Sequence, residues 1–194
     1  MKEVYFQAEA EITGTHPVLL HKCVLSKENA ETGPDQDYSD EWRKATYLDQ
    51  SGKFVVIHSM MLEAMLRVSA TGHKMGKFFM SKLVPAGVEV NEFEVPLLSP
   101  ENEQITLQDI EKEEWLFTTP VNLKGKRVLR TRTCIPPGWK LKFSMSVTNS
   151  IFTPKSIEDL VARGGYAAGL GDWRPSAPKP GKFGQFQLTS FKQY

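Results

Sequence analysis

The chain has 194 residues, 40% of them hydrophobic and 24% charged, and its formal net charge is +1. These values are typical of one globular domain with a sizeable core. No apolar run approaches the roughly 18 residues of a membrane-spanning helix, and the first residues lack the pattern of a secretion signal. Because Cys23 and Cys134 are far apart in the sequence, we expect free thiols and a cytoplasmic location.

The near-neutral total hides blocks of opposite charge. Between Glu89 and Glu114 all charged residues but Lys112 are acidic, whereas residues 115–157 contain only basic ones. The last 35 residues are also mainly basic, with Asp172 as their acid. Such segregation favours a surface that faces a polyanion on one side and repels it on the other. The alternative is two solvated faces that merely differ in sign.

In the first half of the chain, residues 3–12 alternate between apolar and polar types and predict a half-buried first strand. Residues 14–25 predict a loop that ends in a short strand. Residues 26–41 are polar and acidic, which is typical of an exposed insertion. A hairpin is expected around residues 45–57, and Ser59 is expected to cap a helix over 60–69.

In the second half, residues 88–97 predict one strand, and residues 139–147 show the clearest alternation in the chain. Residues 115–133, with a Lys-Gly-Lys turn at their centre, predict a β-hairpin. Thr153 and Pro154 begin a second helix that a Gly-Gly pair at 164–165 is expected to end. A final strand is expected over 184–191.

This order of elements predicts an α+β domain of ferredoxin-like, or RNA-recognition-motif-like, architecture. An antiparallel sheet would carry two helices, a projecting β-hairpin and a C-terminal glycine-rich loop. We expect a single domain over residues 1–194, with a mobile acidic insertion at about 26–41 and a hairpin insertion at about 105–135.

The sequence offers little support for catalysis, and no cofactor or metal is expected. It has no Gly-x-Ser-x-Gly motif, no cysteine pair for zinc and no phosphate-loop motif. His58, which lies between a strand and a helix, is the best candidate for a general base, but one histidine is a weak signal.

The basic hairpin and the glycine-rich loop are the strongest candidates for a functional site. Lysines and arginines contact the phosphates of nucleic acids, and aromatic and arginine side chains stack on bases. The predicted nucleic-acid-binding residues are Lys124, Lys126, Arg127, Arg130, Arg132, Lys140, Lys142, Trp173, Arg174 and Lys182. The predicted loop-shaping residues are Gly165, Gly169, Gly171, Asp172, Gly181 and Gly184.

Three of these residues also have plausible structural roles. Asp172 and Arg174 are close enough in sequence to form a local ion pair that shapes the loop. Trp173 is as well suited to fill the protein's own core as to contact a ligand.

The C-terminal motif Gly-x-Gly-Asp-Trp-Arg-Pro at 169–175, followed by Gly-x-Phe-Gly-x-Phe at 181–186, resembles the RAMP superfamily of CRISPR-associated RNA-binding proteins. The similarity extends to the strand and helix at 52–69, to residues 127–132 and to Trp139. In pattern the chain is most similar to phage and prophage proteins that carry a variant of this motif.

This resemblance implies a non-catalytic protein that binds single-stranded RNA or DNA and assembles along the strand, in the host cytoplasm if a phage encodes it. Two alternatives stay open. One is a protein-interaction module that caps or mimics a RAMP-type host assembly through its acidic block. The other is a metal-independent RNA endonuclease with His58 or His73 as the general base.

Overall fold

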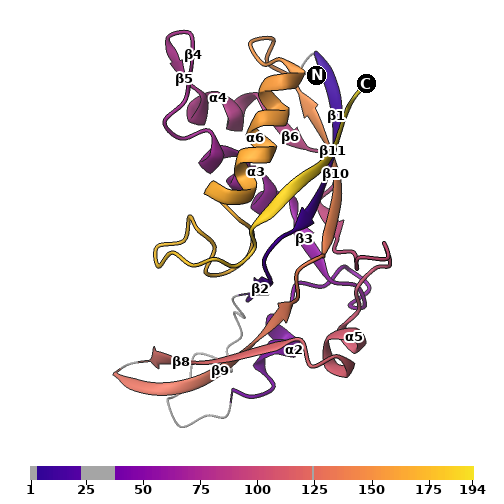
Figure 1. The fold of residues 1–194 in the computed structure, drawn as a ribbon, viewed down its shortest axis with the longest axis vertical. Helices are drawn as coiled ribbons and strands as arrows, with labels where there is room; N and C mark the ends of the chain where they lie inside the picture. The colour runs from indigo at the N-terminus through magenta and orange to yellow at the C-terminus, as the bar shows by residue number, and fades with distance from the viewer. Residues whose placement is uncertain (1–3, 23–37, 124) are drawn as a thin grey trace.

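The computed structural model describes residues 4–22, 38–123 and 125–194, and Figure 1 shows that the fold is elongated. A four-stranded sheet with two long helices forms one end. The other end holds a long β-hairpin and shorter elements. Most of the insertion expected at 26–41 lies outside the described residues.

The main sheet has the strand order β11-β1-β10-β6, and every neighbouring pair is antiparallel. Its strands are β1 (Phe6–Gly14), β6 (Val88–Val90), β10 (Lys140–Val147) and β11 (Phe186–Gln193). Helix α3 (Ser59–Ser69) lies between β1 and β6 in the chain, and α6 (Pro154–Ala167) lies between β10 and β11. This βαββαβ connection with the first and third strands central is the ferredoxin-like arrangement, so the expected fold class is confirmed.

Alternation along β1 and β10 builds one face of the core. Ala8 pairs with Met145, Ala10 with Phe143 and Ile12 with Leu141, and all six side chains are buried. Side chains two residues apart on a strand share a face. The predicted period-two patterns at 3–12 and 139–147 therefore correspond to real strands that bury their apolar residues against the helices.

The Gly-Gly pair at 164–165 lies inside α6 and does not end it, which corrects the sequence-based prediction. A Cβ atom at Gly164 would lie 2.1 Å from Met65 Sδ of α3. One at Gly165 would lie 1.9 Å from the Phe186 carbonyl oxygen of β11. The two glycines therefore allow α6 to approach a helix and a strand closely. Gly165 consequently has a packing role and does not shape the loop.

The second sheet has the order β2-β9-β8, with β2 (Val18–Leu20), β8 (Leu116–Leu123) and β9 (Lys126–Ile135). Strands β8 and β9 form the projecting hairpin that the sequence predicts (Figure 1). Helix α2 (Glu41–Ala45) packs on β9, and α5 (Leu107–Lys112) precedes β8. Neither of these short helices was predicted.

The predicted strand at 88–97 is two strands that belong to different sheets. β6 joins the main sheet, while β7 (Glu94–Pro96) pairs with β3 (Val56–His58). Helix α4 (Met80–Gly87) and the small hairpin of β4 (Lys74–Met75) and β5 (Phe78–Phe79) were also not predicted. Short elements of this kind depend on tertiary contacts more than on their own periodicity.

Ser59 is the first residue of α3 and not its cap. His58 occupies the N-cap position, and no side chain caps the helix there. The Ser59 amide donates to the Phe93 carbonyl oxygen. By contrast, Thr153 caps α6 with a capping box, as the sequence predicts.

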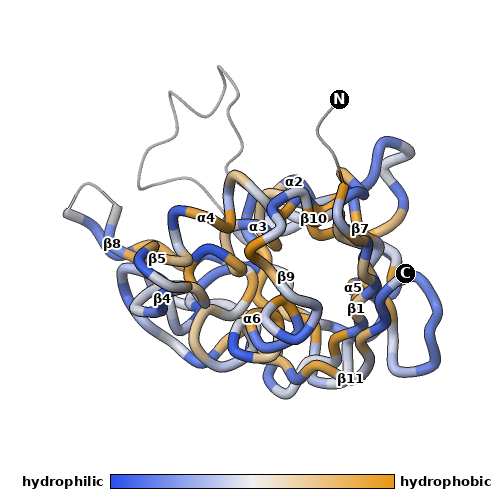
Figure 2. Tube along the Cα trace, turned by 90° about the horizontal axis from the view of Figure 1, so that it is seen from above, coloured by the Kyte–Doolittle hydropathy of each residue, from blue (hydrophilic) through white to orange (hydrophobic). Residues whose placement is uncertain are grey.

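Hydrophobic stretches of the chain concentrate on elements that meet in the interior, including α4 and β10 (Figure 2). Within the described part of the chain, no helix is long and apolar enough to cross a membrane.

Candidate nucleic-acid interface

The β8–β9 hairpin and the glycine-rich loop between α6 and β11 lie next to each other and extend from the same side of the molecule (Figure 1). Along β9, side chains alternate between the two faces of the hairpin. Arg130 and Arg132 therefore share one face, and Arg127 lies on the other. The three arginines do not form one continuous row.

Arg130 is held by a carboxylate of the same chain. Its guanidinium Nε donates to Glu41 Oε2 over 2.7 Å, and Nη2 donates to Oε1. It also lies over the ring of Tyr38, with 5.1 Å from its Cζ to the ring centroid. This bidentate contact fixes α2 against β9 and occupies the side of Arg130 that would otherwise contact a phosphate.

Arg132 is buried at the base of the hairpin, with only 6% of its surface exposed. Its Nη1 donates to Thr119 Oγ1 over 3.1 Å, and its Nε lies 3.7 Å from Asp172 Oδ2. Burial lowers the pKa of its guanidinium, and the nearby Asp172 opposes that effect. Arg132 therefore joins the hairpin to the glycine-rich loop.

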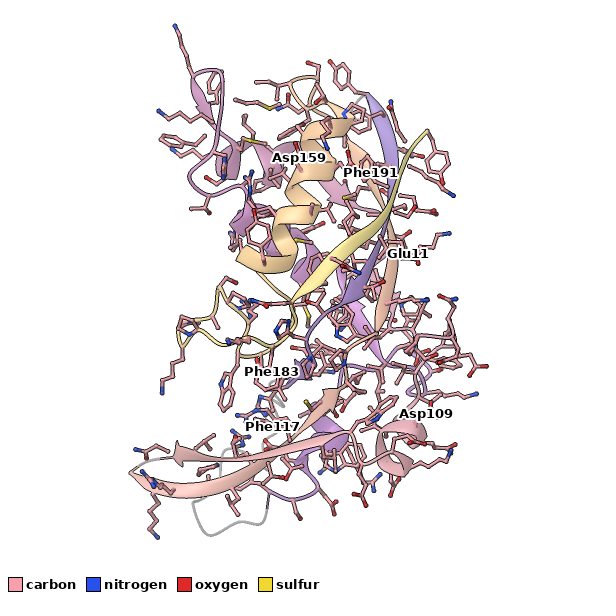
Figure 3. All side chains as sticks on the ribbon, viewed as in Figure 1. Glu11, Asp109, Phe117, Asp159, Phe183 and Phe191 are labelled. Carbon is pink, nitrogen blue, oxygen red and sulfur yellow. The ribbon has the colours of Figure 1, made fainter. Side chains whose placement is uncertain are left out.

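An aromatic cluster makes the second contact between these elements. Phe117 of β8 lies 6.0 Å from Trp173 and 5.3 Å from Phe183, measured between ring centroids. Figure 3 shows Phe183 of the loop close to Phe117. Arg132 lies over the Trp173 ring at 5.4 Å. Trp173 is half-buried and thus packs against side chains of its own chain.

The loop needs glycine where it meets β2. Gly171 has a φ of +72°, and a Cβ atom there would lie 2.3 Å from the Leu19 carbonyl oxygen. The next residue, Asp172, donates its amide to the same oxygen over 2.7 Å. This contact places the Asp172 carboxylate near Arg132.

Arg174 and Asp172 do not form the local ion pair considered from the sequence. Arg174 Nη1 donates to the Gly171 carbonyl oxygen over 2.8 Å, and its Nε donates to Ser176 Oγ over 3.1 Å. Burial raises the pKa of the Asp172 carboxyl, and the nearby charges of Arg132 and Arg174 oppose that rise.

A pocket of about 300 Å³ lies between the glycine-rich loop and the start of α3. It is lined by His21, Tyr47, His58, Met60, Met61, Ala64, Gly169, Leu170, Gly171, Asp172 and Arg174. The walls are mainly apolar and aromatic, and the polar groups come from the loop and the two histidines. This composition is typical of small-ligand sites.

The two histidines of this pocket differ in their surroundings. The His58 ring packs edge-on between Tyr47 and Phe93, with centroid distances of 5.4 and 5.3 Å. His21 lies 3.6 Å from Glu41 and 3.9 Å from Asp172. Burial, with help from Arg130 and Arg132, lowers the pKa of His21 to about 4. His21 is therefore neutral at physiological pH.

The other predicted cations are dispersed. Lys142 pairs with Glu9 over 3.1 Å on the main sheet, and Lys140 donates to the Pro100 carbonyl oxygen. Arg127 and Lys182 are exposed, and the described residues place no carboxylate within ion-pair distance of either. Lys126 is exposed beside Arg127, and Lys124 lies outside the described residues. Lys126, Arg127 and Lys182 thus lie on the hairpin and the loop, while Lys140 and Lys142 lie elsewhere.

Sequence reasoning missed Glu41, His21, Tyr47 and Phe117. Glu41 falls at the end of a segment that was interpreted as a solvated insertion, and the other three are single residues without a motif. No local pattern marks such residues, because their roles arise from contacts between distant segments. Of the histidines considered as a general base, His58 lines the pocket and His73 does not.

No family model matches the sequence, and no curated protein matches it. Solved structures do resemble it. One is a chain from the cryo-EM structure of the type III-B Cmr-beta complex bound to cognate target RNA, with a TM-score of 0.58 and 15% identity. The match covers 98% of this chain and 61% of the other, so this chain spans about three fifths of that protein's length.

At this level of identity the similarity concerns the fold. It agrees with the ferredoxin-like α+β architecture expected from the order of elements.

Proposed function

We propose that this protein binds single-stranded nucleic acid, with RNA as the favoured ligand, along the side from which the hairpin and the glycine-rich loop extend. The observation that carries the proposal is the direct packing of the loop on the base of the hairpin. Arg132 lies 3.7 Å from Asp172, and Phe117 contacts Trp173 and Phe183. Two elements that supply cations are thus held in a fixed relation to each other.

The cations that we assign to phosphate contacts differ from those in the sequence-based list. Arg130 and Arg132 hold the scaffold together, so binding is assigned to the exposed Arg127 and Lys182, together with Lys126 next to Arg127 on the hairpin. Single strands are usually held by a row of cations with sequence-tolerant stacking on aromatic or arginine side chains. The chain similar in fold comes from an RNA-bound complex, which further favours RNA.

Fluorescence anisotropy with labelled single-stranded RNA and DNA tests this proposal. The double variant Lys126→Ala/Arg127→Ala is expected to weaken binding at low salt by about tenfold, because each lost phosphate contact removes counterion release. Lys155→Ala is the matched control, since Lys155 lies on α6 and pairs with Glu158 and Asp159. Unchanged affinity in the double variant would contradict the assignment of the hairpin.

The protein's role is binding without cleavage in this proposal. End-labelled RNA that stays intact after prolonged incubation with purified protein is the expected result. Cleavage that disappears in a His58→Gln variant would instead support the endonuclease alternative, because His58 lines the pocket beside the loop.

A second candidate function, docking on another protein, is favoured by an acidic surface. Glu101, Glu103, Glu111, Glu113 and Glu114 are all exposed, around and before α5. We propose that this surface contacts a basic surface on a second copy or on a RAMP-type partner. Size-exclusion mass measured with and without RNA checks it, and a monomer under both conditions would argue against self-association.

A further inference from the structure

The pocket between the glycine-rich loop and α3 has a polar end that its own chain leaves incompletely hydrogen-bonded. Asp172 Oδ2 lies 3.7 Å from Arg132 Nε and 3.9 Å from His21 Nδ1, both beyond hydrogen-bond distance. The described residues donate no hydrogen bond to this carboxylate. Arg132 Nε and His21 Nε2 are buried and also lack partners among the described residues.

Buried polar groups are nearly always hydrogen-bonded, so the two buried nitrogens beside this carboxylate call for an explanation. Arg132 is 6% exposed and Asp172 is only partly buried, so the carboxylate is reached from the pocket. The described residues hold no cluster of His, Cys, Asp or Glu side chains suited to a metal ion. A ligand with hydrogen-bond donors fits this end better than a cation does.

The rest of the pocket suits a flat, largely apolar ring. Met60, Met61 and Ala64 from α3 and Leu170 from the loop form apolar walls. Tyr47 and His58 add aromatic rings that lie edge to face with each other. Unstacked bases of single-stranded RNA are commonly held on aromatic side chains and hydrogen-bonded along their Watson–Crick edges.

We propose that this pocket accepts one unstacked guanine base of the bound strand, with its Watson–Crick edge against Asp172. The inference deepens the proposed function, because it gives the protein a base preference. A carboxylate accepts two parallel hydrogen bonds. Guanine presents two adjacent donors, its ring N1–H and its exocyclic amino group, whereas adenine, cytosine and uracil do not.

Arg174 complements this assignment. Two of its nitrogens are held by the Gly171 carbonyl oxygen and Ser176 Oγ, which fixes the guanidinium in the pocket that Asp172 also lines. For its remaining nitrogen, Nη2, the described residues provide no acceptor. A donor next to a carboxylate matches the guanine edge, where the O6 acceptor is adjacent to the N1–H donor.

Binding of labelled oligouridine tracts that differ at one central position tests the proposal. The centre is uridine, guanosine, inosine, adenosine or cytidine. The guanosine tract is expected to bind about tenfold more tightly than the uridine tract, as one bidentate base contact provides. Inosine lacks the exocyclic amino group and is expected to fall between them. Equal affinity for all five tracts would overturn the proposal.

Two variants locate the effect in the pocket. Asp172→Asn replaces one acceptor oxygen with a donor, and Ala64→Leu fills the apolar end without touching Asp172. Both are expected to remove the guanosine preference, and Ala64→Leu is expected to keep the affinity for oligouridine. His73→Gln, outside this pocket, is the control. Because Asp172 lies near Arg132 and His21, binding by Asp172→Asn is compared with the wild type only if the variant has the same thermal unfolding midpoint. Whether or not it does, a guanosine preference that persists in Ala64→Leu overturns the proposal.

A separate measurement distinguishes failure of this inference from failure of strand binding. Guanosine 5′-monophosphate is titrated into the wild-type protein, and the ring C–H signals of its four histidines are followed by NMR. His21 and His58 are expected to shift, while His16 and His73 stay in place. Such shifts support the pocket even if no oligonucleotide binds. Their absence, with no preference among the tracts, overturns it.

Discussion

The guanidinium of Arg130 on β9 donates two hydrogen bonds to both carboxylate oxygens of Glu41 on α2. This pair joins residues 89 positions apart and fastens helix α2, which packs on β9. The arginine that the sequence marks as a phosphate ligand is therefore part of the protein's own framework.

The first prediction concerns this pair. Glu41→Ala leaves the Arg130 charge half-buried without its partner, and is expected to lower the free energy of unfolding by about 1–3 kcal/mol. Urea denaturation followed by circular dichroism measures it. Arg43→Ala is the control, because its contact with Glu111 is exposed to solvent, so its loss is expected to have little effect on stability. If both variants lose the same free energy of unfolding, the burial of the Arg130–Glu41 pair does not add to stability.

The second prediction concerns the glycines inside α6. Gly165→Ala places a Cβ atom 1.9 Å from a backbone oxygen of β11, which cannot move without disturbing the sheet. A loss of about 3 kcal/mol or more in stability is expected, despite the better helix propensity of alanine. Thermal unfolding checks it. Tyr166→Ala, at an exposed neighbouring position, is expected to have little effect.

The third prediction concerns pH. The pKa of His21 is lowered from 6.5 to about 4 in the folded protein, so between these values the unfolded chain binds more protons. The neutral His21 therefore contributes to the free energy of unfolding in full above pH 6.5. This contribution, up to about 3 kcal/mol, is lost as the pH falls toward 4.

Urea denaturation at pH 7 and pH 4 tests this dependence. His21→Gln is expected to lose less stability than the wild type between the two pH values, because glutamine does not titrate. His16→Gln, whose partner is the neighbouring Thr15, is expected to behave as the wild type does. An identical pH dependence in the wild type and His21→Gln would contradict the lowered pKa.

The fourth prediction concerns salt. For single strands the logarithm of the binding constant falls with the logarithm of salt concentration by about 0.7 per phosphate contacted. Arg127→Ala is expected to reduce this slope by about that amount, and Lys182→Ala likewise. Arg127→Lys, which keeps the charge, is expected to keep the slope. If neither Arg127→Ala nor Lys182→Ala changes the salt dependence, the strand contacts other residues.

The sequence predicted much of the fold, because period-two and helical patterns report local burial directly. The strands at 3–12 and 139–147, the helix that begins after Thr153 and the hairpin were all recognised in this way. Boundaries failed where a tertiary contact decided them. The Gly-Gly pair at 164–165 has the composition of a helix end, and only its contacts with Met65 and Phe186 show why it lies inside a helix.

The candidate site was predicted less well than the fold. The sequence identified the glycine-rich loop and the basic hairpin as the two elements of interest. It could not tell which arginines contact carboxylates of the same chain, because Glu41 and Asp172 reach β9 from distant segments.

By itself, the sequence determined the α+β class, the order of the main-sheet strands and the two long helices, and the segregation of charge, since these follow from periodicity, turn residues and composition. Only the tertiary structure decided that Arg130 and Arg132 support the scaffold, and that His21 and His58 line one pocket with Asp172. The physical reason is that hydrogen bonds and ion pairs depend on distances of a few ångströms. Those distances are set by how separate strands and loops pack, and no local pattern records them.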